Sequence, residues 1–430
     1  MSIYKLNALY LTVFCIIGVF AFAAGIILTN HVDLFFNETY SAQDLQIAQV
    51  LMLVLTINIC ISFPAPLFTS YISSQERFIF QNTISMVSSI MIPIVNILIL
   101  CIGFRSVGMV IASTTISISV ALINAFYCIM KLRMKFVFNG FNFQLLKEIF
   151  VFTIFIAVNQ IIDQINWQTD KVVLAKVVNG TSVAIYAVGA HINTIFTSFS
   201  TAVSNVFAPK VNMIVSNNNP SMIEELTALF TKVGRIQFYI FSLILSGFVL
   251  FGKFFIIKWA GDEYVNAYYV SVLLMAPAVV PLIQNIGIEI QRAEYKHKFR
   301  SIVYFFMAVI NVVITVFLSR IWHEIGAAIG TTISLILANG VVMNIYYHKQ
   351  CDIDIIYFWK SILRTIKGMI IPIAFGCLFL KFYTLKSYVD FSLVVILYTA
   401  VYAISLFYFS FNEDERKLVV GLKNKVLKRR

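Results

Sequence analysis

Charged residues are scarce in this chain, and long polar stretches are absent. Of its 430 residues only 12% are Asp, Glu, Lys or Arg, whereas 60% are hydrophobic. A folded chain with so little charge cannot cover itself with a water-compatible surface, which excludes an ordinary soluble globular protein. No loop between the apolar runs is long enough to fold as a separate domain, so we expect the protein to act within or beside a membrane.

Sequence patterns for several kinds of chemistry are also missing. The chain has no Walker motif, no zinc-binding pattern and no nucleophile triad, so the sequence predicts no ATP hydrolysis, no bound metal and no cofactor. Its six cysteines lie mostly within apolar stretches, at spacings that do not suit a metal. We interpret the cysteines as packing residues.

What the chain does have is a series of apolar stretches, each near the ~20 residues that a helix needs to cross a ~30 Å hydrocarbon core. They predict an all-α polytopic membrane protein with about 12 transmembrane helices. The stretches cover residues 6–28, 47–71, 79–103, 107–130, 149–170, 183–208, 234–257, 264–288, 301–319, 325–347, 362–383 and 391–411.

Lysine and arginine alternate between abundant and rare in successive loops. One set of loops, together with the chain ends, holds 24 of the 32 basic residues. The positive-inside rule places this set and both termini in the cytoplasm. The net charge of +12 therefore indicates membrane topology and attraction to anionic lipids, and not nucleic-acid binding. The eight basic residues predicted to be outside are Arg105, Lys171, Lys176, Lys253, Lys258, Arg320, Lys381 and Lys386.

An internal repeat relates two parts of the chain. A shift of 217 residues places Pro64 on Pro281 and the Thr-Thr-Ile-Ser run at 114–117 on that at 331–334. Two copies in one orientation imply a pseudo-two-fold axis along the membrane normal. Because nothing precedes the first copy while stretches 149–170 and 183–208 precede the second, we expect the first lobe to lack two leading helices. The predicted domains are a four-helix lobe (1–130), a six-helix lobe (131–350) and two further helices with a basic tail (351–430).

The most polar apolar stretch is 149–170. Asn159, Asp163, Asn166 and Asp170 follow i, i+4, i+7, i+11 spacing, which puts them on one helical face. A carboxylate near the middle of a membrane needs a wet cavity or a partner, so Asp163 is interpreted as the residue that takes up an ion during transport. The alternative is that this face only bonds helices together.

Several neighbouring polar residues extend this predicted pathway. We interpret Asp170 and Lys171 as an outer pair that ends the helix, and His191 as either a titrating group or a local hydrogen-bonding residue. The complete predicted substrate and ion pathway contains Asn159, Gln160, Asp163, Gln164, Asn166, Asp170, Lys171 and His191.

Two other features concern movement and the inner surface. Pro64 and Pro66 lie in a helix equivalent by the repeat to that of Pro277 and Pro281, and such residues bend helices, so they are predicted hinges. Ser221 and Glu224 form a capping-box pattern. It predicts a short amphipathic helix on the inner face, before the stretch 234–257.

The run that starts Trp167-Gln168-Thr169-Asp170-Lys171 resembles the seventh-helix signature of the polysaccharide flippases. These belong to an exporter superfamily that also holds the multidrug-and-toxin extruders and the lipid II flippases. The segments around Arg77 and Arg292 resemble the inner-face loops of that family. The resemblance implies fourteen helices, arranged as two six-helix lobes around a central cavity with a two-helix appendage. This sequence departs from that pattern by lacking the first two helices.

The resemblance also implies a function, that of a transporter and not an enzyme. We expect a flippase that moves a polyprenyl-pyrophosphate-linked oligosaccharide by alternating access, driven by a proton or sodium gradient, in lipopolysaccharide or capsule biosynthesis. The expected location is a bacterial cytoplasmic membrane, among membrane lipids and beside polysaccharide polymerase machinery. The alternatives are a drug or cation antiporter of the same superfamily, and a membrane enzyme acting on lipid-linked sugars. Such an enzyme usually carries a larger outer loop than this chain has.

Overall fold

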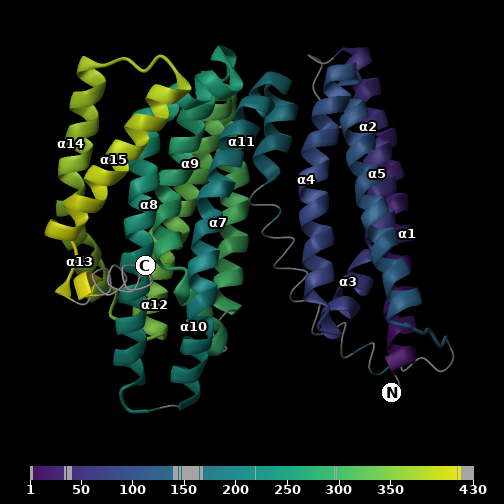
Figure 1. Cartoon of the computed structure of the whole chain (residues 1–430), viewed down its shortest axis with the longest axis horizontal. Helices are drawn as coiled ribbons and strands as arrows, with labels where there is room; N and C mark the ends of the chain where they lie inside the picture. The colour runs from purple at the N-terminus through teal and green to yellow at the C-terminus, as the bar shows by residue number, and fades with distance from the viewer. Residues whose placement is uncertain are drawn as a thin grey trace, which may run out of the picture. The chain divides into compact units, whose positions relative to one another are not determined.

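The chain folds into two compact units, Met1–Ile156 (unit 1) and Ala157–Arg430 (unit 2), each built from helices (Figure 1). The structure is a computed structural model. It describes residues 3–32, 35, 41–138, 144, 147, 164, 168–217, 219–294, 296, 298–413 and 415–417, without the side chains of 202, 205 and 298. The predicted domain boundaries at 130 and 350 stay a prediction.

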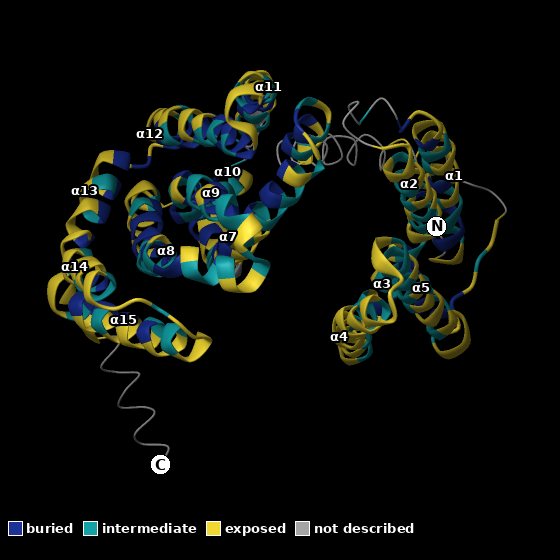
Figure 2. Cartoon of the chain, turned by 90° about the horizontal axis from the view of Figure 1, so that it is seen from above, coloured by how far each residue is buried: buried dark blue, intermediate teal, exposed yellow. Residues whose placement is uncertain are grey.

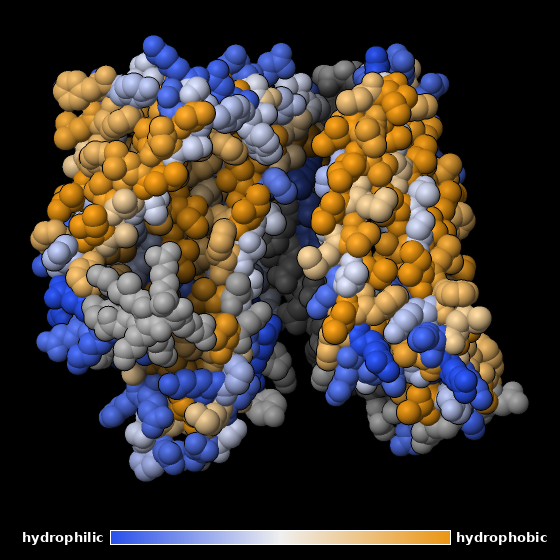
Figure 3. Space-filling model, viewed as in Figure 1, coloured by the Kyte–Doolittle hydropathy of each residue, from blue (hydrophilic) through white to orange (hydrophobic). Residues whose placement is uncertain are grey.

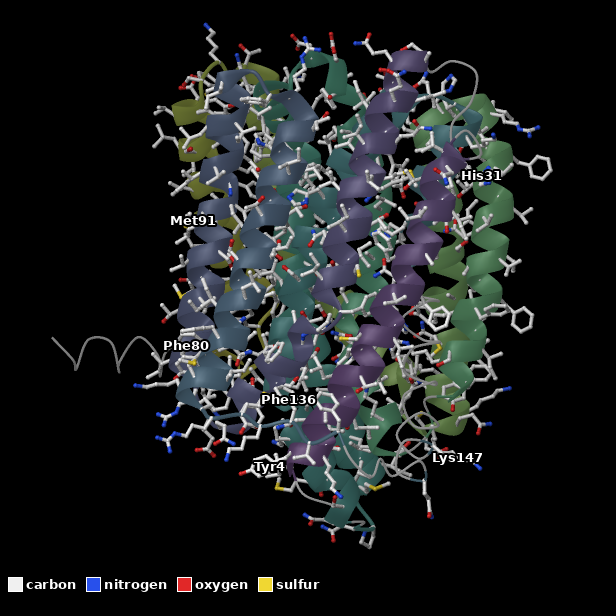
Figure 4. The ribbon with its side chains drawn as sticks, turned by 90° about the vertical axis from the view of Figure 1, so that its right-hand side faces the viewer. Tyr4, His31, Phe80, Met91, Phe136 and Lys147 are labelled. Atoms are coloured by element: carbon white, nitrogen blue, oxygen red, sulfur yellow. The ribbon has the colours of Figure 1, made fainter. Side chains whose placement is uncertain are left out.

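Unit 1 contains a bundle of long helices that is closed at one end by a small core. Leu67, Cys128 and Met134 are buried there, and the rings of Phe80 and Tyr127 stack at 3.7 Å. Tyr4, Phe80 and Phe136 lie at this end and His31 at the other (Figure 4). The elements are α1 (Ile3–Asn30), α2 (Ala42–Ser62), α3 (Ala65–Ser74), α4 (Phe78–Ile102), α5 (Arg105–Phe126) and the π-helix η2 (Tyr127–Lys131).

Unit 2 holds most of the buried residues, which Figure 2 shows on α8, α9 and α10, whereas α4 of unit 1 has none. An unlabelled helix over 168–177 precedes the others. The labelled elements are α7 (Gly180–Asn217), α8 (Met222–Ala260), η3 (Asp262–Tyr264), α9 (Val265–Ile283), α10 (Ile286–Ala293), α11 (Lys298–Leu335), the π-helix η4 (Ile336–Met343), α12 (Asn344–Gln350), α13 (Ile355–Thr365), α14 (Lys367–Phe382) and α15 (Tyr388–Phe409).

In the described part of the chain, nine segments are long and apolar enough to cross a membrane. One of them, Phe299–Gln350, contains two predicted stretches, because the backbone leaves the helical conformation at Trp322 and His323. The chain folds back there so closely that a Cβ on Gly326 would lie 2.2 Å from the carbonyl oxygen of Leu318. Each unit carries a hydrophobic band between hydrophilic ends (Figure 3). The predicted all-α polytopic membrane fold is therefore confirmed, although α7, long but more polar, is not among the nine.

The predicted short surface helix at the start of α8 is wrong. α8 is one helix of 39 residues, and its first turns carry Leu226, Leu229 and Phe230 into the main core of unit 2. The predicted capping box is absent too, because the Ser221 hydroxyl donates to the carboxylate of Glu225 and caps no backbone group. The apolar positions that suggested membrane contact are packed against other helices of the same unit.

The appended helix α15 packs on α8 through tyrosines. The Tyr398 hydroxyl donates to Ser246 Oγ at 2.7 Å, and the Tyr402 hydroxyl lies 2.6 Å from Ser242 Oγ. Both tyrosine side chains are almost fully buried. Since a buried hydroxyl needs a partner, these contacts fix the register of α15 along α8.

The element boundaries follow the sequence repeat. The break between α2 and α3 at Pro64 matches the break between α9 and α10 at Gln284 to within four residues of the 217-residue shift. Unusual backbone recurs as well, because Arg105 and His323 both have a φ of +49°. Pro64 and Pro66 adjoin the first break, Pro281 lies in the last turn before the second, and Pro277 lies about two turns before it, inside α9. Their role as hinges stays a prediction.

Candidate functional site: a buried carboxylate shared by four helical segments

The helix of Asp170 runs further than its sequence suggests. Residues 168–177 are helical and α7 begins only at Gly180, so the prediction that Asp170 and Lys171 end the helix is wrong. The helix ends instead before Asn179, whose side-chain oxygen accepts a hydrogen bond from the backbone N–H of Ser182 at 2.9 Å. This is a helix N-cap, which starts α7 and separates it from the preceding helix.

Asp170 is the most completely enclosed carboxylate among the described residues, with 1% of its surface exposed. It accepts hydrogen bonds from three hydroxyl groups. Tyr186 of α7 and Thr331 of α11 donate to Oδ2, the latter at 2.6 Å, and Thr315 of α11 donates to Oδ1 at 3.1 Å. Because α11 folds back at Trp322–His323, four separate helical segments meet at this one side chain.

The four residues lie at a common depth. Asp170 and Tyr186 lie nine and seven residues from Asn179, and Thr315 and Thr331 each lie eight residues from His323. At 1.5 Å per residue, all four are roughly 10–14 Å from the turns at that end of the unit. The site is therefore inside the apolar part of the bundle, where an isolated charge is costly.

Two acceptor oxygens at the site lie within reach of the same hydroxyl hydrogen. The Thr315 hydroxyl lies 3.1 Å both from Oδ1 of Asp170 and from Oδ1 of Asn311. A hydroxyl has one hydrogen, so it satisfies one of these two oxygens and leaves the other without it. A proton on Asp170 would remove the shortage, because the carboxyl group could then donate to Thr315 while Thr315 donates to Asn311.

No cation of the described part of the chain forms an ion pair with Asp170. Its sequence neighbour Lys171 is half-exposed and donates to the side-chain oxygen of Gln168 at 3.1 Å. The ion pairs between two described residues join Arg235 to Glu415, Arg292 to Glu289 and Lys296 to Glu294, and none includes Asp170. Nor do these residues contain a group of three or more His, Cys, Asp or Glu that could hold a metal ion. Asp170 is thus held by hydroxyl groups alone.

The structure describes only some of the other predicted pathway residues. Gln164 is helical and exposed, and His191 is exposed on α7. The remaining predicted residues lie outside the described residues: Asn159, Gln160, Asp163 and Asn166.

Sequence reasoning did not find the partners of Asp170. Thr331 belongs to the Thr-Thr-Ile-Ser repeat, but that run suggested a duplication and not a site. Asn311 and Thr315 are four residues apart in an apolar stretch, which is the spacing of one helical face. That polar pair was the available signal. Only the fold brings it to a carboxylate 145 residues away.

Comparison with known proteins places this architecture in a family. The family described as polysaccharide biosynthesis protein matches residues 5–240, which is more than half of the chain. The chain belongs to this family. No curated protein matches it significantly.

Solved structures show the same fold. The inward closed conformation of the lipid II flippase MurJ is similar with a TM-score of 0.74 and 16% sequence identity, over 93% of this chain and 83% of that one. A MOP superfamily transporter from Pyrococcus furiosus is similar with a TM-score of 0.53 and 16% identity, over 80% of this chain and 79% of that one. The family member thus has the fold of the exporter superfamily that its sequence resembles.

Proposed function

We propose that this protein is a flippase that carries a lipid-linked oligosaccharide from the inner to the outer leaflet of a bacterial cytoplasmic membrane. Membership of the polysaccharide biosynthesis protein family supports the substrate class, and the fold shared with a lipid II flippase supports the type of transport. A substrate of this kind has a polar glycan and an apolar tail, so its carrier needs a polar path for the one and access to lipid for the other. A polymerase that uses the exported units would be the partner on the outer side.

We further propose that transport is coupled to a cation at Asp170. The observation that carries this proposal is the buried Asp170 carboxylate, which has no ion-pair partner among the described residues and shares one hydroxyl donor with Asn311. A carboxylate that is enclosed by four helical segments is stable when it binds a proton or cation and costly when it is empty and charged. Binding and release therefore change how tightly the four segments hold together, which is how an ion gradient can drive a conformational cycle. We take the proton as the coupling ion, because a proton on Asp170 would give it a hydrogen to donate to Thr315.

The substitution Asp170→Asn tests this coupling. It keeps the size of the side chain and its hydrogen bonds, since hydroxyl groups can rotate to accept from the new amide. We expect membrane insertion to stay near normal and surface polysaccharide to fall at least tenfold in a strain whose own gene is deleted. Asp163→Asn is the paired variant, because the sequence makes Asp163 the other candidate for the coupling residue.

The outcomes separate the possible roles. Loss of export by D170N alone assigns coupling to Asp170, and loss by D163N alone assigns it to Asp163. Full export by both variants would contradict carboxylate coupling. In proteoliposomes, transport that follows an imposed pH gradient without sodium supports the proton, whereas an absolute need for sodium overturns that choice. Normal export with no glycan phenotype in the deletion strain would overturn the flippase itself.

A further inference from the structure

The short helix α13 presents three different faces. Ile355, Phe358 and Ile362 are buried in the main core of unit 2. The ring of Phe358 packs edge-on against Phe230 at 4.9 Å, and it fills the space above Gly234, where a Cβ would lie 2.5 Å from it. One face of α13 is thus fixed to α8.

A second face of α13 is apolar and uncovered. Ile356 and Leu363, two turns apart, are 58% and 59% exposed. In a membrane protein these side chains need contact with lipid, since they gain nothing from water. They place α13 at the depth where acyl chains begin.

The third face is basic. Lys360 and Arg364 are exposed and four residues apart, so they are neighbours on the helix surface. Neither belongs to an ion pair of the described residues. The acidic residues nearest in sequence, Asp352 and Asp354, precede the helix, and Asp354 caps it by accepting from the backbone N–H of Tyr357 at 2.8 Å. Lys367 follows at the start of α14, so the basic face has no acidic residue within it.

We propose that α13 lies in the inner surface of the membrane, binds anionic phospholipid headgroups through Lys360 and Arg364, and transmits this contact through Trp359 to the break between α9 and α10. A helix with an apolar side and a basic side has the composition of an interfacial helix, with the basic side directed to headgroup phosphates. Figure 2 shows α12, α13 and α14 following one another along the edge of unit 2, where lipid has access. The positive-inside pattern predicts that this edge faces the cytoplasm.

Trp359 connects α13 to the interior of unit 2. Its indole N–H donates to Oδ1 of Asn344 at 2.8 Å, and the same oxygen accepts from the side-chain amide of Gln284 at 2.7 Å. Gln284 is the residue at which α9 ends, and it is 2% exposed. One carbonyl oxygen, with its two lone pairs both used, therefore joins the membrane-surface helix to the helix break.

Asn344 also fixes an unusual segment of helix. Its side-chain amide donates to the carbonyl oxygens of Asn339 and Gly340, at 2.6 and 3.1 Å, at the end of the π-helix η4. Wide turns of this kind interrupt regular helices and are frequent at functional sites. A shift of α13 that pulls Trp359 away would leave Asn344 and Gln284 to rearrange together. A change in lipid binding at α13 would thereby alter the break between α9 and α10.

Lipid binding is tested directly by native mass spectrometry of the purified full chain, offered phosphatidylglycerol and phosphatidylcholine in competition. The variant is K360Q/R364Q, and the matched control is K381Q/K386Q, which removes two basic residues at the other end of α14. A basic side chain near an anionic surface favours association roughly fivefold, so we expect the first variant to lose about 25-fold in preference for phosphatidylglycerol. The control should keep it.

Three results would overturn the proposal. They are an unchanged preference in K360Q/R364Q, an equal loss in the control, and retention of a polyprenyl pyrophosphate in place of phosphatidylglycerol at this helix. Size-exclusion profiles and unfolding temperatures identical to those of the unaltered protein verify folding, which exposed side chains should not affect.

Transmission to the hinge is tested with Trp359→Phe, which keeps an aromatic ring and removes the N–H. Transport is measured in vesicles of phosphatidylcholine with and without phosphatidylglycerol. This assay rests on the proposed function, whereas the lipid-binding measurement does not. We expect W359F to bind phosphatidylglycerol normally while transport loses its response to that lipid. W259F, at an exposed tryptophan of α8, should stay responsive. A W359F variant that still responds fully would overturn the transmission step.

Discussion

The Thr315 hydroxyl is the single group on which the balance of hydrogen bonds at Asp170 depends. Thr315→Val keeps the shape and removes the hydrogen for which Asp170 and Asn311 compete. We expect the variant to lose about 1–3 kcal/mol of stability, because two buried oxygens lose their shared donor. Thermal unfolding of the purified protein measures this, and Thr315→Ser should restore most of it.

A buried threonine of unit 1 supplies a control for that substitution. Thr114 is the equivalent of Thr331 in unit 1, and its buried hydroxyl has no hydrogen-bond partner among the described residues. Thr114→Val should therefore be neutral or slightly stabilising, since it removes an unsatisfied polar group. Equal losses from T315V and T114V would mean that the hydroxyl groups act through packing and not through Asp170.

At the scale of elements, one ion pair joins helices α8, α13 and α15 to the segment that follows α15. Arg235 of α8 donates to both carboxylate oxygens of Glu415 at 2.8 Å and to the carbonyl oxygens of Ser361 in α13 and Ser410 after α15. Burial opposes ionisation of Glu415. Hydrogen bonds from Arg235, from the N–H of Asn412 and from Tyr239 nevertheless hold its pKa below its ordinary value of 4.5.

This ion pair gives stability a defined pH dependence. A carboxylate with a lowered pKa in the folded protein stabilises it above the ordinary value, and the contribution disappears as the pH falls from 4.5 through the lowered pKa. We expect Glu415→Gln to cost about 3 kcal/mol at neutral pH, since Arg235 stays buried without its partner. Unfolding curves of the two proteins should converge in acid. Glu413→Gln, at an exposed neighbour, should behave like the unaltered protein at every pH.

The element boundaries show which helices could be predicted from the sequence and which could not. Apolar stretches located the membrane-crossing helices, because hydropathy directly reports contact with lipid. They did not reveal that α7 extends to Asn217, that α8 begins at Met222, or that α13 exists. In those segments the apolar residues alternate with polar ones, since packing against protein is needed on one side only. Asp170 was found because a carboxylate in an apolar stretch is unusual, whereas its partners depend on contacts across 145 and 161 residues.

At the scale of the whole molecule, the orientation in the membrane remains a prediction from the basic residues. Single cysteines at Ser216 and Ser387, in a protein freed of its six own cysteines, test it. Ser216 lies near the end of α7 and Ser387 caps α15. We expect an impermeant thiol reagent to label the Ser387 position in intact cells and the Ser216 position only after permeabilisation. The reverse pattern would invert the direction of transport proposed above.

Residues with a positive φ lie at nearly equivalent places of the predicted repeat in the two units. Arg105 and His323 share a φ of +49°, and Arg133 and Asp352 have φ values of +51° and +53°. Such conformations disfavour residues other than glycine by roughly 1 kcal/mol or more, yet none of the four is glycine. Positions close to one another under the predicted repeat thus combine a similar unusual φ with different side chains. The shape of a connection between helices can therefore recur without its chemistry, just as the fold of the whole bundle is shared with a solved structure at 16% identity.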